Sequence, residues 1–196
     1  MTAPDARILA AAADLLRRVG PGRATIVQIA EAAGMSHANV YRYFPSKAAL
    51  VEEVTAVWLR PIEAEARAIA DGPDPAPDKL ERLLFAIHRS YRDKLEADPR
   101  LFAMLAAAAA ANSGVARKHR ARLQAIVQRV VEEGRAQQRF PQTDVRRAME
   151  TVFDVCHRFL HPVAVELDRD LPRASVDRRA ARVARLTLRA LAAGRG

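Results

Sequence analysis

The chain has 196 residues, of which 50% are hydrophobic and 28% charged. This balance can bury a core, which excludes a disordered chain and favours one domain or two small ones. A single cysteine, Cys156, excludes an internal disulfide framework and an all-cysteine metal site. The formal net charge of +9 points to an anionic partner such as nucleic acid, and a genomic bias towards arginine is the alternative explanation.

Two features of the sequence predict where the protein works. The first apolar stretch, 8–16, contains Asp14 and lacks an end typical of a signal-peptide cleavage site. The uncharged run that begins at Leu101 is shorter than the roughly 20 residues that span a bilayer. The sequence therefore predicts a soluble, cytoplasmic protein with no membrane partner.

Helical spacing of apolar residues recurs along the whole chain, whereas strand patterns are almost absent. A first helix is predicted from Ile8 to Val19, and Gly20-Pro21-Gly22 is typical of a helix end. The sequence therefore predicts an all-α fold.

Two short helices follow, each with a cap of its own. Thr25 lies three residues before Gln28, which is the spacing of a capping box. Gly34 permits the sharp corner after this helix, and Ser36 caps the next one. These four residues predict two helices joined by a tight turn.

The rest of the chain also reads as helices, separated by joins rich in proline and glycine. Ser46 caps a fourth helix, and the proline-rich segment 71–77 is the clearest linker. Further helices are expected at about 78–96, 99–111, 114–138, 142–167 and 173–193. Pro162 is expected to kink the helix that contains it, and the total is about nine helices.

The short helix pair at 25–44 has the pattern of a helix-turn-helix. Val40 and Phe44 are apolar on one side of its second helix, and the other side is polar. A helix held by its inner face in this way can place its N-terminal end in a major groove of DNA. There Asn39 can bond adenine or another base edge, and His37 can bond guanine or thymine.

Two segments of this region resemble the DNA-binding head of the TetR family of bacterial regulators. They read Thr25-Ile-Val-Gln-Ile-Ala-Glu-Ala-Ala-Gly-Met-Ser36 and Asn39-Val-Tyr-Arg-Tyr-Phe-Pro-Ser-Lys47, and the likeness covers about residues 5–55. The resemblance implies a helix-turn-helix DNA-binding head at 1–50 and a helical effector-binding and dimerisation domain at 51–196. It also implies a homodimer, a double-stranded DNA operator and a small-molecule effector of unknown identity.

The same resemblance implies roles for individual residues. Thr25, Tyr41 and Lys47 are expected to contact phosphate. Base or backbone contacts are expected from Ser36, His37, Asn39, Arg42 and Tyr43. Ala38 departs from the family, which often has glycine at this position. Its side chain slightly limits how closely this helix backbone can approach DNA.

The last two predicted helices carry apolar stripes that suggest a dimer interface. One stripe, near heptad spacing, consists of Val176, Ala180, Val183, Leu186, Thr187, Ala190 and Leu191. The other consists of Val145, Met149, Val152, Cys156, Phe159 and Val163. Two such helices from each subunit can form a four-helix interface, and ordinary packing within one chain is the alternative.

A polar group in the body suggests a ligand or metal site. His157 and His161 are four residues apart, a spacing that suits a divalent metal, with Asp154 on the same face and His119 or His88 as a further ligand. No cofactor is otherwise expected. The alternatives are a plain polar lining of an organic-ligand pocket and a structural role. The pocket candidates are Phe102, Leu105, His119, Phe153, His157 and His161.

The leading functional hypothesis is a ligand-responsive repressor that binds a palindromic operator as a homodimer and is released by its effector. A metal or redox sensor using His157, His161 and Cys156 is a second hypothesis. An enzyme is not expected, because the sequence lacks a glycine-rich phosphate loop, a Gly-x-Ser-x-Gly motif and a nucleophilic Cys–His pattern. A DNA-packaging protein is disfavoured by the sharply capped recognition helix.

Overall fold

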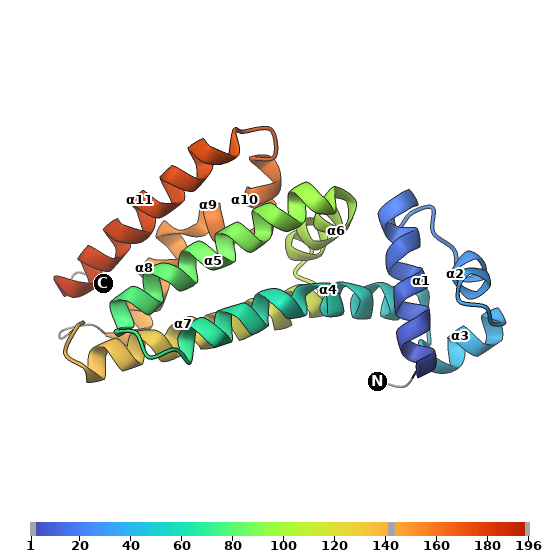
Figure 1. Cartoon of the computed structure of the whole chain (residues 1–196), viewed down its shortest axis with the longest axis horizontal. Helices are drawn as coiled ribbons and strands as arrows, with labels where there is room; N and C mark the ends of the chain where they lie inside the picture. The colour runs from blue at the N-terminus through green and yellow to red at the C-terminus, as the bar shows by residue number, and fades with distance from the viewer. Residues whose placement is uncertain (1–2, 141–143, 195–196) are drawn as a thin grey trace.

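The computed structural model describes residues 3–140 and 144–194. Within these ranges the chain forms eleven helices and no strand, which confirms the all-α prediction. The helices are α1 Ala3–Val19, α2 Ile26–Ala32, α3 His37–Tyr43, α4 Lys47–Ala70, α5 Ala76–Ala97, α6 Pro99–Ala110, α7 Gly114–Ala136, α8 Val145–Val155, α9 His157–Leu160, α10 Pro162–Leu167 and α11 Arg173–Ala192. Figure 1 shows α1, α2 and α3 gathered at one end of an elongated molecule, beside a larger body.

The three small helices form a head around a hydrophobic core of their own. The apolar faces of α1, α2 and α3 meet the start of α4 there, and Leu16, Ile29, Val40 and Leu50 are buried in it. Each face is apolar because its residues recur at helical spacing, so every helix contributes one side only. The head is therefore a folded unit that presents its remaining side chains to solvent.

The predicted caps and turn of the head are present. Thr25 and Gln28 form the capping box, and the Ser36 side chain accepts a hydrogen bond from the backbone of Asn39. Gly34 has a φ of +65°, which is the left-handed conformation that the corner between α2 and α3 requires. These local interactions set the angle at which α3 leaves the turn.

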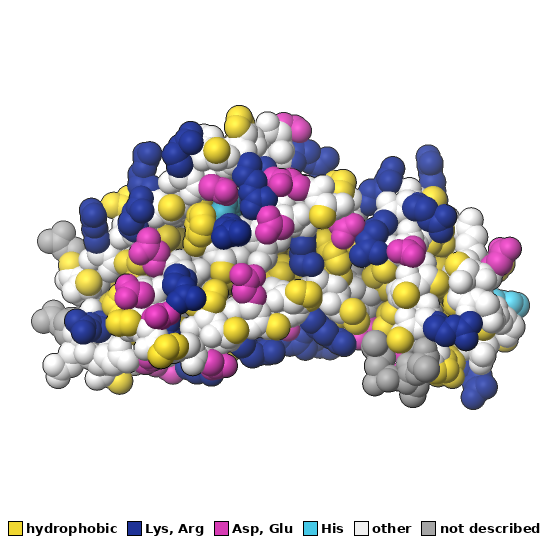
Figure 2. Space-filling model, viewed as in Figure 1, with side chains coloured by type: hydrophobic (Ala, Val, Ile, Leu, Met, Phe, Trp, Pro, Cys, Tyr) yellow, Lys and Arg dark blue, Asp and Glu magenta, His cyan; other side chains and the backbone are white. Residues whose placement is uncertain are grey.

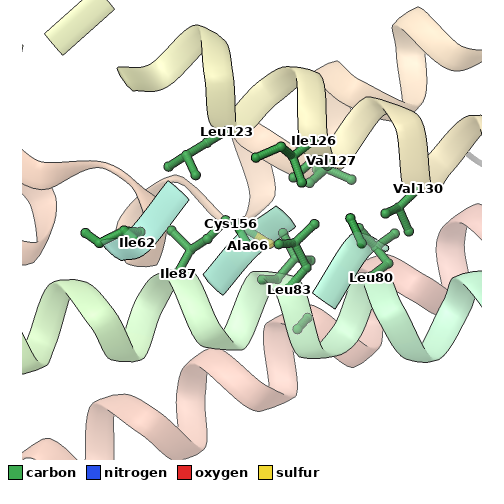
Figure 3. Close-up of a cluster of buried hydrophobic side chains, with 14 of the residues drawn as sticks. Ile62, Ala66, Leu80, Leu83, Ile87, Leu123, Ile126, Val127, Val130 and Cys156 are labelled. Carbon is green, nitrogen blue, oxygen red and sulfur yellow. The ribbon is translucent and has the colours of Figure 1, made fainter. Parts of the chain in front are cut away.

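The body is built on α4, α5 and α7, which pack side by side along most of their length (Figure 1). Figure 3 shows the core between them, and α8, α9 and α11 pack against α5 or α7. Its labelled side chains are Ile62, Ala66, Leu80, Leu83, Ile87, Leu123, Ile126, Val127, Val130 and Cys156. The long helix α4 belongs to both parts, because its first turns lie in the head core and its later turns in this one.

The boundary expected at residue 50 falls inside α4, which is continuous from Lys47 to Ala70. Val54 still packs in the head core, and Leu101 of α6 reaches it from the body. The two predicted domains are thus joined by an unbroken helix. Among the described helices, none is both long enough and apolar enough to cross a bilayer.

The single helix expected at 142–167 is wrong. The chain forms three helices there, α8, α9 and α10, with breaks at Cys156 and His161; positions 142 and 143 lie outside the described residues. His161 is extended, with φ −102° and ψ 123°, because Pro162 disfavours a helical conformation in the residue before it. No glycine or proline lies at the break at Cys156, so the spacing of apolar residues did not predict it.

The two apolar stripes assigned to a dimer interface lie mostly inside the protomer. Three of their members, Val152, Cys156 and Leu191, are buried in the body core, and Thr187 is buried beside Cys156. Phe159, Val176 and Ala180 form a small cluster between α9 and α11. The stripes therefore pack within one chain, and Leu186 is the exception, since it is 53% exposed.

The contact between Gly134 and Phe140 generates a test of the body core. A Cβ at Gly134 would overlap the ring of Phe140, which is fully buried against the end of α7. Overpacking of this kind costs about 1–3 kcal/mol. It outweighs the gain in helix propensity of at most about 1 kcal/mol that alanine brings. We expect Gly134→Ala to lower the free energy of unfolding measured by urea denaturation.

Gly22→Ala is the matched control, because a Cβ there meets no atom within 4 Å and the backbone is not left-handed. This variant should unfold like the parent protein. Equal stability of both variants and the parent would show that the Phe140 ring is not held against Gly134.

Candidate functional site

The outer face of α3 is the first candidate site. Val40 and Phe44 are buried against the head core, so the helix is held by one side only. The turn before it is fixed by Arg7, whose guanidinium donates a 2.5 Å hydrogen bond to the carbonyl oxygen of Ala33. The orientation of α3 is therefore set by contacts that leave its opposite face open.

The residues predicted to contact DNA all lie at this end of the head. Thr25, Ser36, His37, Tyr41, Arg42 and Tyr43 are exposed, whereas Asn39 and Lys47 are half-buried. The hydroxyls of Thr25 and Ser36 are used as caps. In the described part of the chain, the other six side chains make no hydrogen bond, ion pair or ring contact, and α3 carries no acidic residue. The structure thus gathers polar groups that the fold itself leaves free.

A contact that the sequence did not reveal ties the head to the body. The Asp98 carboxylate accepts hydrogen bonds from Arg17 Nε at 2.9 Å and from Trp58 Nε1 at 3.0 Å. Arg17 ends α1, Trp58 lies in α4, and Asp98 stands directly before α6. One side chain therefore joins the head to two helices of the body. The only signal in the sequence was the Asp98-Pro99 join, which indicated a helix start.

The second candidate site is a cavity of about 310 Å³ in the body. It lies between α5, α6 and α7 on one side and α8 to α10 on the other. Its buried part is lined by Ile87, Tyr91, Leu105, Ala116, His119, Leu123 and Pro162. Its outer part is lined by Ala109, Asn112, Arg117, Arg120, Gln124, Phe153, Asp154, His157, Leu160 and His161. The site therefore has an apolar floor and a polar rim.

Five of the six residues proposed for a pocket line this cavity, namely Leu105, His119, Phe153, His157 and His161. Phe102 does not, because its ring is buried between the rings of Trp58 and Tyr91. Sequence reasoning missed Arg120 among others, since nothing in the spacing of a charged helix face shows which member borders a cavity.

A buried chain of hydrogen bonds runs below the cavity floor. The Tyr91 hydroxyl lies 3.0 Å from His119 Nε2, and His119 Nδ1 lies 2.8 Å from a carboxylate oxygen of Glu63. Arg122 donates to the same carboxylate at 3.2 Å. Because a carboxylate only accepts, Nδ1 carries the proton, and in the neutral ring Nε2 accepts the Tyr91 hydroxyl proton.

The pKa directions of Glu63 and Tyr91 show which of these two groups is charged. Burial alone would raise the pKa of Glu63, but the hydrogen bonds from His119 and Arg122 outweigh it and hold the pKa below its ordinary value. Burial raises the pKa of Tyr91, and the charge of Glu63 adds to the effect. Glu63 is thus a buried carboxylate, and Tyr91 remains a neutral phenol.

The metal proposed for His157 and His161 is not supported. Their rings stack at 4.6 Å, and His119 is committed to Tyr91 and Glu63. His88 bonds Asp177 instead of facing the cavity. Because the helix breaks after Asp154, the expected continuous face does not form. Among the described residues, no group of three or more His, Cys, Asp or Glu side chains is arranged to hold a metal.

A redox role for Cys156 is equally unsupported. The thiol is buried against Thr187 and does not line the cavity. Burial raises its pKa, which keeps the unreactive thiol form. Cys156 is a core residue.

Comparison with known proteins gives two family matches. A model described as bacterial regulatory proteins, tetR family, matches residues 8–54. A model described as the tetracyclin repressor-like C-terminal domain matches residues 76–183. The first match covers the head and the second covers the body helices that enclose the cavity.

Relatives and solved structures agree with these matches. The chain is 35% identical over 95 residues to the HTH-type transcriptional regulator RutR of Escherichia coli K12, which is 46% of this chain and 44% of RutR. The match thus spans less than half the length of that relative. FadR of Thermus thermophilus, a repressor in complex with lauroyl-CoA, has a TM-score of 0.63 at 22% identity, covering 97% of this chain and 94% of that one.

FadR of Bacillus subtilis in complex with stearoyl-CoA is also similar, with a TM-score of 0.65 at 16% identity over 96% of this chain and 98% of that one. FadR of Bacillus halodurans has a TM-score of 0.68 at 17% identity, covering 97% and 95%. At these identities the likeness shows a common fold.

The lowered pKa of Glu63 generates a prediction about pH. A group whose pKa falls on folding stabilises the native state above its ordinary pKa of 4.5, and this contribution disappears as pH drops through the folded value. We expect Glu63→Gln to lower the free energy of unfolding by about 1 kcal/mol or more at pH 7, because charge-assisted bonds become neutral ones. The difference from the parent protein should shrink below pH 4.5 in urea titrations.

Glu65→Gln is the control, since Glu65 lies on the same helix but is exposed and bonds only Ser90. Its effect should stay within about 0.5 kcal/mol at every pH. A gap for Glu63→Gln that does not change with pH would contradict an ionised Glu63 in the folded protein.

Proposed function

The chain belongs to the TetR family of bacterial regulatory proteins, so it is a DNA-binding transcriptional regulator and not an enzyme, and from this premise we propose a ligand-responsive repressor. It binds a palindromic operator as a homodimer in the cytoplasm, and a small-molecule effector in the body cavity releases it. The observation that carries the DNA-binding part is the outer face of α3, whose polar side chains have no partner within the described chain.

In this proposal α3 enters the major groove of DNA. Its N-terminal end presents His37 and Asn39 to base edges, because a helix held by its inner face projects these side chains outward. Tyr41, which is 46% exposed, and Lys47 at the start of α4 contact phosphates on either side. The absence of acidic residues on α3 removes repulsion from the DNA backbone.

A homodimer supplies the second head that a palindromic operator requires. Two recognition helices related by a two-fold axis read half-sites about 34 Å apart. We propose that the C-terminal helices form the interface through their outer faces, because the apolar stripes themselves are buried. Leu186 is an exposed apolar residue on α11, and Val155 at the end of α8 is another.

The charges on these helices favour a crossed arrangement of the two subunits. Figure 2 shows Lys and Arg side chains along the outer edge of the body over α11. The exposed arginines of α11 are Arg178, Arg179, Arg182, Arg185 and Arg189, and none makes an ion pair within the described residues. Glu150 and Asp154 on α8 are exposed carboxylates, and Glu150 bonds Arg146 of its own helix at 2.7 Å. Placing α11 of one subunit on α8 of the other brings arginines to Asp154, which has no ion-pair partner within the described residues.

Release by an effector requires that the cavity and the head share a moving part. Helix α6 borders the cavity with Leu105 and Ala109, while Leu101 packs in the head core and Asp98 bonds the head. A ligand that displaces α6 would therefore shift the head relative to the body. The effector acts only through its difference in affinity between the two arrangements. The acyl-CoA ligands in two structures of similar fold support a small organic effector.

The proposed base contact predicts a specific loss of affinity. Asn39→Ala should weaken binding to the specific operator by about 1–3 kcal/mol and leave binding to random DNA almost unchanged, because base contacts carry sequence information. Fluorescence anisotropy with an operator duplex and a scrambled duplex measures both. An equal loss on the two duplexes would contradict a base-reading role.

Lys47→Ala provides the contrast within the same head. It should weaken both duplexes alike and reduce the slope of log K against log salt by about one per subunit, because a phosphate contact releases one counterion.

The dimer proposal predicts that Leu186→Arg weakens self-association. A further positive charge would replace an apolar contact on a face that already carries five arginines. We expect the dimer dissociation constant from sedimentation to rise about tenfold or more, with a parallel loss of operator binding. Leu186→Met keeps the apolar surface and should behave like the parent protein. Unchanged association of the Leu186→Arg variant would place the interface elsewhere.

A further inference from the structure

The body cavity is apolar at its buried floor and charged at its exposed rim. Its floor is mostly apolar and buried, whereas Arg117 and Arg120 lie at the exposed rim, where Asp154 is the only carboxylate among the described lining residues. Two arginines against one carboxylate leave an excess of positive charge at the mouth. We propose that the cavity takes an amphipathic anion, with its negative group at Arg120 and its apolar group against Tyr91. This inference rests on the proposed role of the cavity as the effector site.

The floor disfavours a negative group. With a neutral His119, Tyr91 donates its hydroxyl proton to His119 and His119 donates to Glu63, so the Tyr91 oxygen offers only its lone pairs to a ligand. An anion there would face an acceptor in front of a buried carboxylate, without a donor to compensate its desolvation. An alkyl or aryl group instead meets the side chains of Ile87, Leu105 and Leu123.

The rim supplies the donors that the floor lacks. Arg117 already donates to the carbonyl oxygen of Asn112 at 3.1 Å, but Arg120 has no hydrogen-bond or ion-pair partner in the described chain. His161 borders the same part of the cavity, and its Nδ1 is buried without a hydrogen-bond partner. Burial, with the nearby His157 and Arg120, lowers the pKa of His161, so its ring is neutral at pH 7. The rim therefore places the unpaired cation of Arg120 and the unsatisfied Nδ1 of His161 in the same part of the cavity.

The size of the cavity limits the ligand. A volume of about 310 Å³ is at the lower end of the roughly 300–1,000 Å³ that is usual for ligand pockets. It suits a compact group such as a medium-length acyl chain or a phenylalkyl group. The same chemistry has two sources, a free carboxylate or an acyl thioester whose phosphates stay at the rim.

Calorimetric titration of the full-length protein with matched ligands tests the proposal. Octanoate and 4-phenylbutyrate represent the free carboxylates, octanoyl-CoA represents the thioester, and octanol and octylamine carry the same chain without a negative charge. We expect at least one anion to bind at least tenfold more tightly than octanol, and octylamine to bind more weakly still. The relative affinities of octanoate and octanoyl-CoA identify the source.

Three variants locate the anion. Arg120→Gln should weaken the preferred anion about tenfold or more and leave octanol unchanged, because a charge-assisted contact is lost. Asp154→Asn should tighten it about two- to fivefold, since a repulsive carboxylate is removed. Lys118→Gln is the matched control on the same helix, because Lys118 is exposed and does not line the cavity; it should change nothing.

The inference is wrong if none of the three anions binds, if octanol binds as tightly as they do, or if Arg120→Gln binds them normally. Operator binding by the same preparations keeps this result separate from the proposed function. Specific DNA binding without anion binding would contradict only the proposed ligand class. Anion binding that leaves the operator complex intact would support the ligand class and contradict the proposal that this ligand releases the protein from DNA.

Discussion

The structure depends on one helix that is buried in two hydrophobic cores. The first turns of α4 place Leu50 and Val54 among the head helices, and its later turns place Ile62 and Ala66 in the body. Trp58 touches both cores. Because burying each apolar side chain contributes about 1.5–3 kcal/mol, neither half of α4 can leave its core without a large loss. The position of the head is consequently fixed to the body through α4.

The polar contacts of α4 join it to helices that border the cavity. Glu63 lies in the second half of the helix and bonds His119, which lines the cavity floor, so a buried hydrogen bond joins α4 to α7. Asp98 forms the complementary contact at the head, holding Arg17 and Trp58 together. Two polar contacts, at Glu63 and at Asp98, therefore join α4 to the helices that border the cavity. A repacking of the cavity that broke these contacts would be costly, because a buried polar atom that loses its partner costs about 1–3 kcal/mol.

Local structure in the head was predictable because its signals are local. The capping box of Thr25 and Gln28, the left-handed Gly34 and the cap at Ser36 act within three or four residues, and all three are present. In the body the same reasoning failed at Cys156, where the chain bends without proline or glycine. It also misassigned the apolar stripes, since a buried face and a dimer face have the same period.

The amino-acid sequence by itself determined the helical class, the sharp turn before α3 and the one-sided polarity of that helix, because these follow from spacing, caps and conformational freedom along the chain. Only the tertiary structure decided that Phe102 belongs to the core while Arg120 borders a cavity, and that Asp98 binds the head. Such facts depend on which helix faces meet across long separations in sequence. That choice is made by the packing of the whole body, and no local pattern records it.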